Sequence, residues 1–109
     1  MPARVVSATW RRTQPRTPHR SVDLVFTNES WEDCQHWLAT DRTILRRLNA
    51  IIKDTSRSPF EGIGKPEPLK GDLSGWWARR ITHEHRFVYR VVGVEGSKAL
   101  EIAACRFHY

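Results

Sequence analysis

Basic side chains are concentrated in one stretch of the chain, between residues 65 and 90. That stretch holds six basic residues against three acidic ones, and two tryptophans, a phenylalanine and a tyrosine lie among them. The six are Lys65, Lys70, Arg79, Arg80, Arg86 and Arg90. On a concave sheet such a combination suits the binding of backbone phosphates and stacked bases. Charge alone favours a solvated sheet face equally well, so both interpretations stay open at this point.

The C-terminus carries a second group of side chains that could do chemistry. The chain ends Cys105-Arg106-Phe107-His108-Tyr109 with no polar tail, although chain ends normally fray. Histidine changes charge near neutral pH, so a strand that stops on His108 and Tyr109 is suited to placing them for use. The alternative is a strand that ends simply where the chain ends.

Other motifs indicate ligand binding only weakly. The GIGK motif at residues 62–65 lacks the Walker spacing and the trailing Ser or Thr of a phosphate-binding loop. His83 and His85 supply two metal ligands, which are too few for a site. We expect Cys34 and Cys105 to pack as small hydrophobic side chains rather than to form a disulfide framework. The sequence therefore predicts no metal and no cofactor.

Composition places these residues in one small domain. The chain has 109 residues, 39% hydrophobic content and a net charge of +6, and no apolar run approaches the ~20 residues of a membrane span. Residues 1–22 hold five arginines and no acid, so the remainder is close to neutral. We expect a cytoplasmic domain over residues 22–109 and, over residues 1–21, an extension that is disordered or loosely attached.

The elements that must position these side chains can be read in order. Residues 22–26 predict a strand, and Thr27 is suited to cap the helix that follows. Apolar residues at helical spacing predict one helix over residues 28–38 and a second over residues 42–53. Ser58-Pro59 ends the second helical region. A long connection over residues 58–75 leads to strands at 76–82, 86–92 and 99–107. This order predicts an α+β domain with a mainly antiparallel sheet.

Alternation divides the side chains of these strands between two faces. In the strand at 76–82, Arg79 shares a face with Trp77 and Ile81, and Arg80 lies on the opposite face. In the last strand, one face is predicted to carry Leu100, Ile102, Ala104 and Arg106.

Four stretches of the sequence resemble the YoeB/Txe family of bacterial toxins, within the RelE/ParE-like superfamily. They are SWEDCQHW, IIKDTSRSPFEGIGKPEPLKGDLSGWWARRI, EHRFVY and IAACRFHY, and they cover nearly all of residues 26–109. The resemblance implies two N-terminal helices packed on a twisted, mainly antiparallel sheet. It also implies a toxin of a type II toxin–antitoxin system that acts as a ribosome-dependent, metal-free mRNA endoribonuclease.

The resemblance assigns roles to individual residues. Glu67 matches the family's general base, Arg86 its phosphate-stabilising arginine, His108 its general acid, and Tyr109 its terminal tyrosine that supports the substrate. The implied reaction is attack of the ribose 2′-OH on the adjacent phosphate, which leaves a 2′,3′-cyclic phosphate and a 5′-OH. Lys70 and Arg80 match further basic positions that contact the RNA in the family. Beyond what the resemblance assigns, we also expect Lys65, Arg79, His85 and Arg106 to bind RNA. The sequence departs from the family pattern at Phe107, where a tyrosine is expected, and at His83, where an acid is expected.

The implied partners are a ribosome with mRNA in its A site and an acidic, YefM-like antitoxin; whether the toxin forms a homodimer stays open. Two other functions remain as alternatives. One is a non-catalytic RNA- or ribosome-binding module, and the other is a ParE-like toxin directed at DNA gyrase. A binding module needs the basic residues but has no use for a base and an acid. Glu67, Arg86 and His108 therefore distinguish an endoribonuclease from a binding module.

Overall fold

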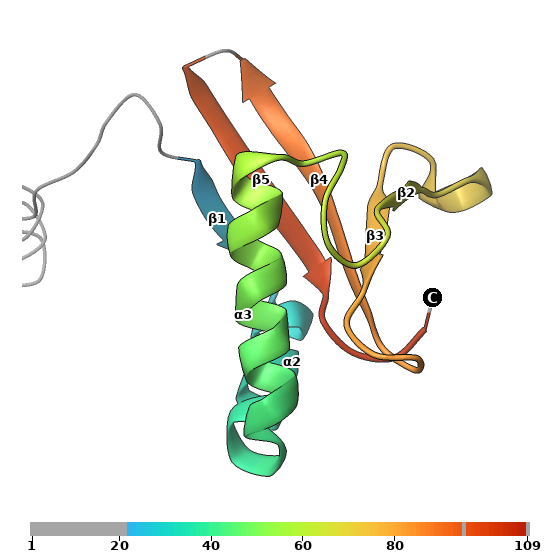
Figure 1. The fold of residues 1–109 in the computed structure, drawn as a ribbon. Helices are drawn as coiled ribbons and strands as arrows, with labels where there is room; N and C mark the ends of the chain where they lie inside the picture. Colours follow the sequence, from blue (N-terminus) through green and yellow to red (C-terminus); the bar gives the residue numbers. More distant parts are fainter. Residues whose placement is uncertain (1–21, 95, 109) are drawn as a thin grey trace, which may run out of the picture.

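A computed structural model describes residues 22–94 and 96–108 of the chain; the predicted extension over residues 1–21 and the predicted substrate contact of Tyr109 lie outside them. The elements are β1 Asp23–Phe26, α2 Asn28–Thr40, α3 Arg42–Arg57, β2 Glu67–Pro68, a 3-10 helix Gly71–Leu73, β3 Trp77–Arg80, β4 Arg86–Val94 and β5 Ser97–Ala104. The five strands form one sheet in the order β1-β5-β4-β3-β2 (Figure 1). Strand β1 is parallel to β5, and the other neighbours are antiparallel. The predicted α+β, mainly antiparallel architecture is confirmed.

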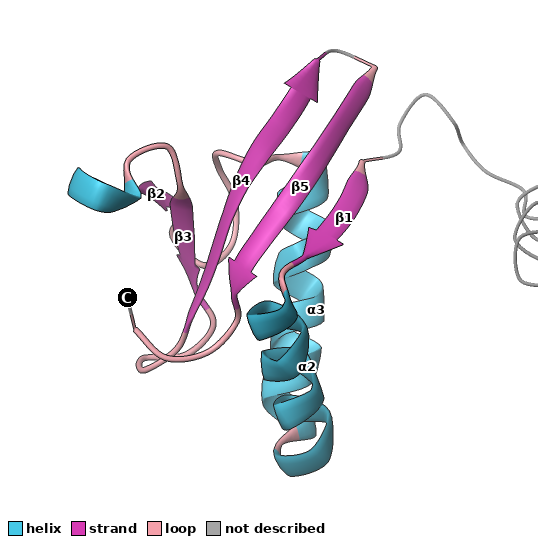
Figure 2. Ribbon diagram, turned by 180° about the vertical axis from the view of Figure 1, so that it is seen from behind, coloured by secondary structure: helices cyan, strands magenta, loops and turns pink. Residues whose placement is uncertain are grey.

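Both helices begin at the residues that the sequence indicates. The Thr27 side chain accepts a hydrogen bond from Ser30 N, which satisfies a backbone donor in the first turn of α2. Asp41 ends α2 and caps α3, where its carboxylate accepts from the backbone N–H groups of Thr43 and Ile44. One shared residue between the helices turns α3 back beside α2, and both cover the same face of the sheet (Figures 1 and 2).

The main core lies between this helix pair and the sheet. Its buried members come from α2, α3, β4, β5 and the segments after β3 and β5, and they are Trp37, Leu48, Ile51, Ile52, Ile81, Phe87, Tyr89, Leu100, Ile102 and Cys105. Each large apolar side chain buried here contributes about 1.5–3 kcal/mol to folding. The helical stripes predicted from the sequence therefore supply one wall of this core. No helix in the described part of the chain is both long and apolar enough to cross a membrane.

The opposite face of the sheet carries a smaller apolar cluster of Leu69, Ala78 and Val88. A β-bulge corrects one prediction on this face. Val88 pairs with Ala104 and Tyr89 with Ile102, so one residue of β5 is unpaired and alternation shifts beyond it. Ala104 consequently packs against the smaller cluster, and does not share a face with Ile102 as predicted.

Two further predictions about the strands are corrected, because one strand was not predicted and another ends earlier than predicted. The connection over residues 58–75 contains an unpredicted strand, β2, which pairs with β3 at the sheet edge. The last strand ends at Ala104 rather than at residue 107, and the chain then bends. Both differences matter for function because β2 carries Glu67 and the bend leads to His108.

Candidate active site

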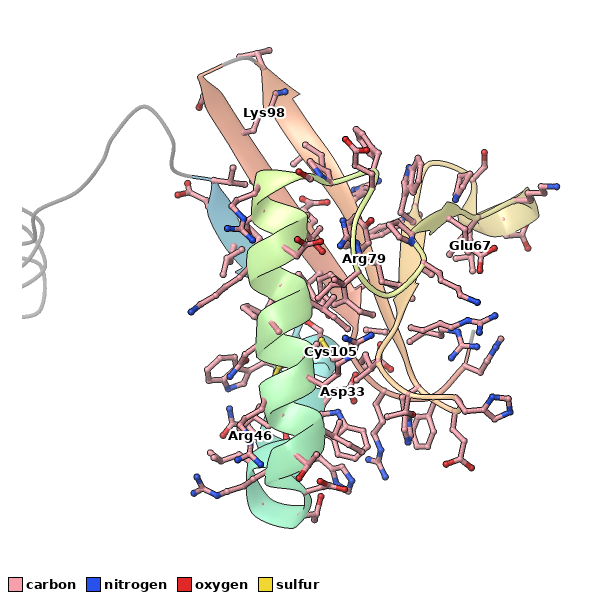
Figure 3. The ribbon with its side chains drawn as sticks, in the orientation of Figure 1. Asp33, Arg46, Glu67, Arg79, Lys98 and Cys105 are labelled. Carbon is pink, nitrogen blue, oxygen red and sulfur yellow. The ribbon has the colours of Figure 1, made fainter. Side chains whose placement is uncertain are left out.

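Strand register brings Glu67, Arg80 and Arg86 to one face of the sheet. Glu67 lies opposite Ala78 in the β2–β3 pair, and Arg80 lies opposite Arg86 in the β3–β4 pair. Residues directly opposite each other, and residues two apart on a strand, project to the same face. Ala78 belongs to the smaller cluster, so these three residues are on the face that the helices leave open. Figure 3 shows Glu67 on the far side of β3 from α3.

The bend after β5 is tied to α2 at Cys105. The backbone N–H of Cys105 donates to Asp33 Oδ2 at 2.9 Å, and Trp37 Nε1 donates to the Cys105 carbonyl at 2.8 Å. Asp33 and Trp37 are one helical turn apart, so a single face of α2 holds both polar groups of this residue. Sequence reasoning missed this role of Asp33, which carries no signal beyond its place near the helix start.

A second pair of hydrogen bonds holds Phe107. Its carbonyl accepts from Arg86 N at 2.9 Å, and its N–H donates to His85 Nδ1 at 2.8 Å. Phe107 has φ +65°, in the left-handed region that non-glycine residues rarely occupy. His108 comes next and is exposed. The chain end is thus attached at Arg86, and the predicted acid follows directly on that attachment.

The Arg86 side chain braces the turn that precedes β4. The residue is 7% exposed, and Nη1 donates to the carbonyls of Thr82, His83 and His85 at 2.9–3.1 Å. These contacts involve one nitrogen of the guanidinium. Within the described residues, Nε and Nη2 make no hydrogen bond, and the guanidinium fork is the geometry that matches two anionic oxygens.

Four cations in or next to the strands of the sheet are exposed or partly exposed. Lys65, Lys70 and Arg80 are all exposed. Arg106 is partly exposed and stacks its guanidinium on the ring of Phe107, 4.4 Å from the centroid. All four were predicted as RNA contacts, and the first three are fully accessible for that role.

Arg79 requires a correction, because the structure buries it completely. Its guanidinium donates to Asp54 Oδ2 at 2.7 Å, to Tyr89 Oη, and to the backbone carbonyls of Ser58, Glu61 and Ile63. All three nitrogens are occupied, so Arg79 offers no donor to RNA in this conformation. It instead fastens the loop between α3 and β2 to the core (Figure 3). The sequence did carry a signal for this burial, because strand alternation places Arg79 on the same face as Trp77 and Ile81.

The Asp54 carboxylate is the ionic partner in this loop, and its hydrogen bond from Arg79, together with one from Ile63 N, lowers its pKa below the ordinary 3.8. A group with a depressed native pKa stabilises the fold above its unfolded pKa, and loses that contribution as pH falls through the native value. The stability of the protein in acid should depend on this carboxylate. We expect Tm to fall on acidification below about pH 4 more steeply in the unmodified protein than in Asp54→Asn. Thermal melts at a series of pH values measure the Tm of each protein. Glu61→Gln, an exposed carboxylate in the same loop, should keep the steep profile, and equal slopes in Asp54→Asn would contradict the assignment.

Comparison with known proteins shows the family of this chain. A family model described as a YoeB-like toxin of bacterial type II toxin-antitoxin systems matches residues 26–109. The chain belongs to the YoeB toxin family. An Escherichia coli protein named Toxin YoeB is 57% identical over 88 residues, which is 81% of this chain and 100% of that toxin.

Solved structures agree with this membership. The YoeB/ParE toxin from Agrobacterium tumefaciens superposes with a TM-score of 0.77 at 52% identity, covering 81% of this chain and 100% of that one. Toxin in a YoeB–YefM complex from Staphylococcus aureus gives 0.70 at 36% identity, covering 82% and 99%. The YafQ toxin of Escherichia coli, at 14% identity and a TM-score of 0.59, shares the fold alone.

Proposed function

We propose that this YoeB-family toxin is a metal-free endoribonuclease that cuts mRNA on the ribosome. One observation supports the proposal above the others. The register of β2, β3 and β4 puts Glu67 and Arg86 on one open face, and the backbone of Arg86 holds the residue before His108. A carboxylate, a guanidinium and an imidazole are the groups that a 2′-OH transesterification needs, and a binding module has no use for the first and the last.

In the proposed reaction the substrate supplies its own nucleophile. Glu67 accepts the proton of a ribose 2′-OH, and the bond from O2′ to the adjacent phosphorus forms. The P–O5′ bond breaks as His108 donates a proton to the departing O5′. The products are a 2′,3′-cyclic phosphate and a 5′-OH, and the reaction as written requires no metal ion. Arg86 would match the phosphorane oxygens as negative charge develops there.

The exposed cations would hold the rest of the RNA. Lys65 and Lys70 flank β2 in the chain, Arg80 lies on the open face, and all three are exposed, so each can neutralise a backbone phosphate. The candidate site is an open surface, so the toxin itself offers little to align a flexible strand. We propose that the ribosome supplies this alignment, which can be worth ~7 kcal/mol or more of the barrier.

A basic, open site also suggests how the toxin is restrained. Staphylococcus aureus relatives form a YoeB–YefM complex and a YoeB dimer. We propose that an acidic YefM-like antitoxin covers the open face here, with a segment that folds as it binds.

Cell-free translation tests the proposed function. Purified toxin added to ribosomes programmed with a defined mRNA should cut that mRNA, and primer extension should locate the cut at the A site. Without ribosomes the same mRNA should remain largely intact. Arrest of translation with intact mRNA would favour a non-catalytic binding module, and gyrase poisoning without cleavage would favour a ParE-like toxin.

Replacing the proposed base should reduce cleavage and preserve binding. We expect Glu67→Gln, which is isosteric and uncharged, to slow single-turnover cleavage by about a hundredfold, as is typical for loss of a general base. Glu61→Gln is the matched control, because Glu61 is an exposed glutamate in the loop before β2, and it should cleave normally. Sedimentation with ribosomes measures binding. Unchanged cleavage by Glu67→Gln would exclude Glu67 as the base.

A further inference from the structure

We infer that His85 is a positioning residue, whose neutral imidazole serves as the hydrogen-bond acceptor that holds the chain end and thereby places His108. The hydrogen bond from Phe107 to His85 is an observation of the structure, and its effect on cleavage through His108 rests on the proposed function. It gives His85 a role different from the RNA contact that the sequence suggested.

The contact fixes the protonation state of the ring. The backbone N–H of Phe107 can only donate, so Nδ1 of His85, 2.8 Å away, must present its lone pair. The ring proton therefore belongs on Nε2. A second proton on Nδ1 would set two donors against each other and break the contact.

The imidazole is held in this orientation from two sides. Its ring meets the Trp37 indole at 4.7 Å between centroids and 74°, an edge-to-face contact, and lies 6.0 Å from the Phe107 ring. Trp37 itself binds the Cys105 carbonyl through Nε1. His85 therefore lies between α2 and the bend that leads to the chain end.

Phe107 needs such a contact because its backbone is in an unfavourable region. With φ +65° it occupies a conformation that a non-glycine residue keeps only when its surroundings impose it. Its carbonyl is bound by Arg86 N and its N–H by His85. Loss of the second bond would free the residue to relax and would displace His108, its neighbour. Misplacement of a catalytic group by 1 Å can cost on the order of a hundredfold in rate.

Two substitutions distinguish the role of His85 as a hydrogen-bond acceptor from the packing contacts that its ring makes. His85→Leu keeps bulk but has no acceptor, whereas His85→Asn places an amide oxygen close to the position of Nδ1. His83→Leu is the matched control, since His83 is an exposed histidine in the same turn. Each variant is examined by hydrogen exchange at the Phe107 amide, followed by NMR, and by single-turnover cleavage on programmed ribosomes.

Exchange at Phe107 tests the contact without any reference to activity. We expect it to be about tenfold or more faster in His85→Leu than in the unmodified protein, and near the unmodified rate in His85→Asn and His83→Leu. A nitrogen-15 spectrum should show the Nε2-H tautomer of His85. Unchanged exchange in His85→Leu would overturn the inference whether or not the protein cuts RNA, whereas a lack of cleavage by the unmodified protein would count against the proposed function alone.

Cleavage tests whether the contact acts through His108. His85→Leu should lower the cleavage rate at saturating ribosomes by about tenfold to a hundredfold with little change in half-saturation, and His85→Asn should restore most of it. Added to His108→Ala, His85→Leu should cause no further loss. Additive losses, or failure of His85→Asn to restore the rate, would instead indicate a direct RNA contact.

Discussion

His108→Ala should cut single-turnover mRNA cleavage on ribosomes by about a hundredfold or more while leaving the fold unchanged. The side chain is exposed and follows Phe107, whose carbonyl accepts a hydrogen bond from Arg86 N, so its removal leaves the core intact. The loss should be chemical, because the departing O5′ would no longer receive a proton from the enzyme. Half-saturation by ribosomes should move little, since the cations proposed to bind RNA lie on other residues.

His83→Ala is the matched histidine control and should cleave at the unmodified rate. Circular dichroism of each variant checks the fold. Arg86→Ala is a poorer test of chemistry, because Arg86 also braces three turn carbonyls and its loss would disturb the attachment of Phe107. Full cleavage after deletion of residues 108–109 would remove His108 from the mechanism.

Arg79→Met should be strongly destabilising, with a loss of about 3–5 kcal/mol in the free energy of unfolding. The Arg79 side chain is fully buried, and its removal would strand a carboxylate, a tyrosine hydroxyl and three backbone carbonyls. Burying acceptors without donors is costly, and methionine supplies none. Urea denaturation followed by tryptophan fluorescence measures the change.

Arg57 provides a control on the same carboxylate. It lies 3.7 Å from Asp54, and its side chain is 78% exposed. An exposed pair of this kind contributes at most about 1 kcal/mol, so Arg57→Met should change stability little. Similar losses in Arg57→Met and Arg79→Met would contradict the view that burial decides the importance of Arg79.

The predictable parts of the fold are those set by local patterns. The Thr27 cap, the apolar stripe of α3 and the helix end at Ser58 all follow from residues within a few positions of each other. Alternation also placed Arg79 with Trp77 and Ile81, on what proved to be the core face. Charge nevertheless led to its prediction as an RNA contact, because an arginine is seldom fully buried.

The parts that could not be predicted depend on contacts between distant segments. Strand β2 has two residues, one of them a proline, and is too short for any periodic signal; its pairing with β3 alone defines it. The bulge in β5 is visible only in the register with β4. The attachment of Phe107 to His85 and Arg86 likewise joins residues that are 22 and 21 positions apart. The resemblance named Glu67, Arg86 and His108. The long-range pairing places Glu67 and Arg86 on one face of the sheet and holds the residue before His108 at Arg86.

The most direct measurement of the central claim replaces the 2′-OH of the substrate. An mRNA with 2′-deoxyribose only at the nucleotide 5′ to the cut is loaded on ribosomes, and its cleavage is compared with that of the all-ribose mRNA. The account predicts no cleavage at the modified nucleotide, and from the unmodified mRNA fragments that end in a 2′,3′-cyclic phosphate and begin with a 5′-OH. Cleavage of the deoxy substrate at the same position, or fragments that begin with a 5′-phosphate, would contradict it.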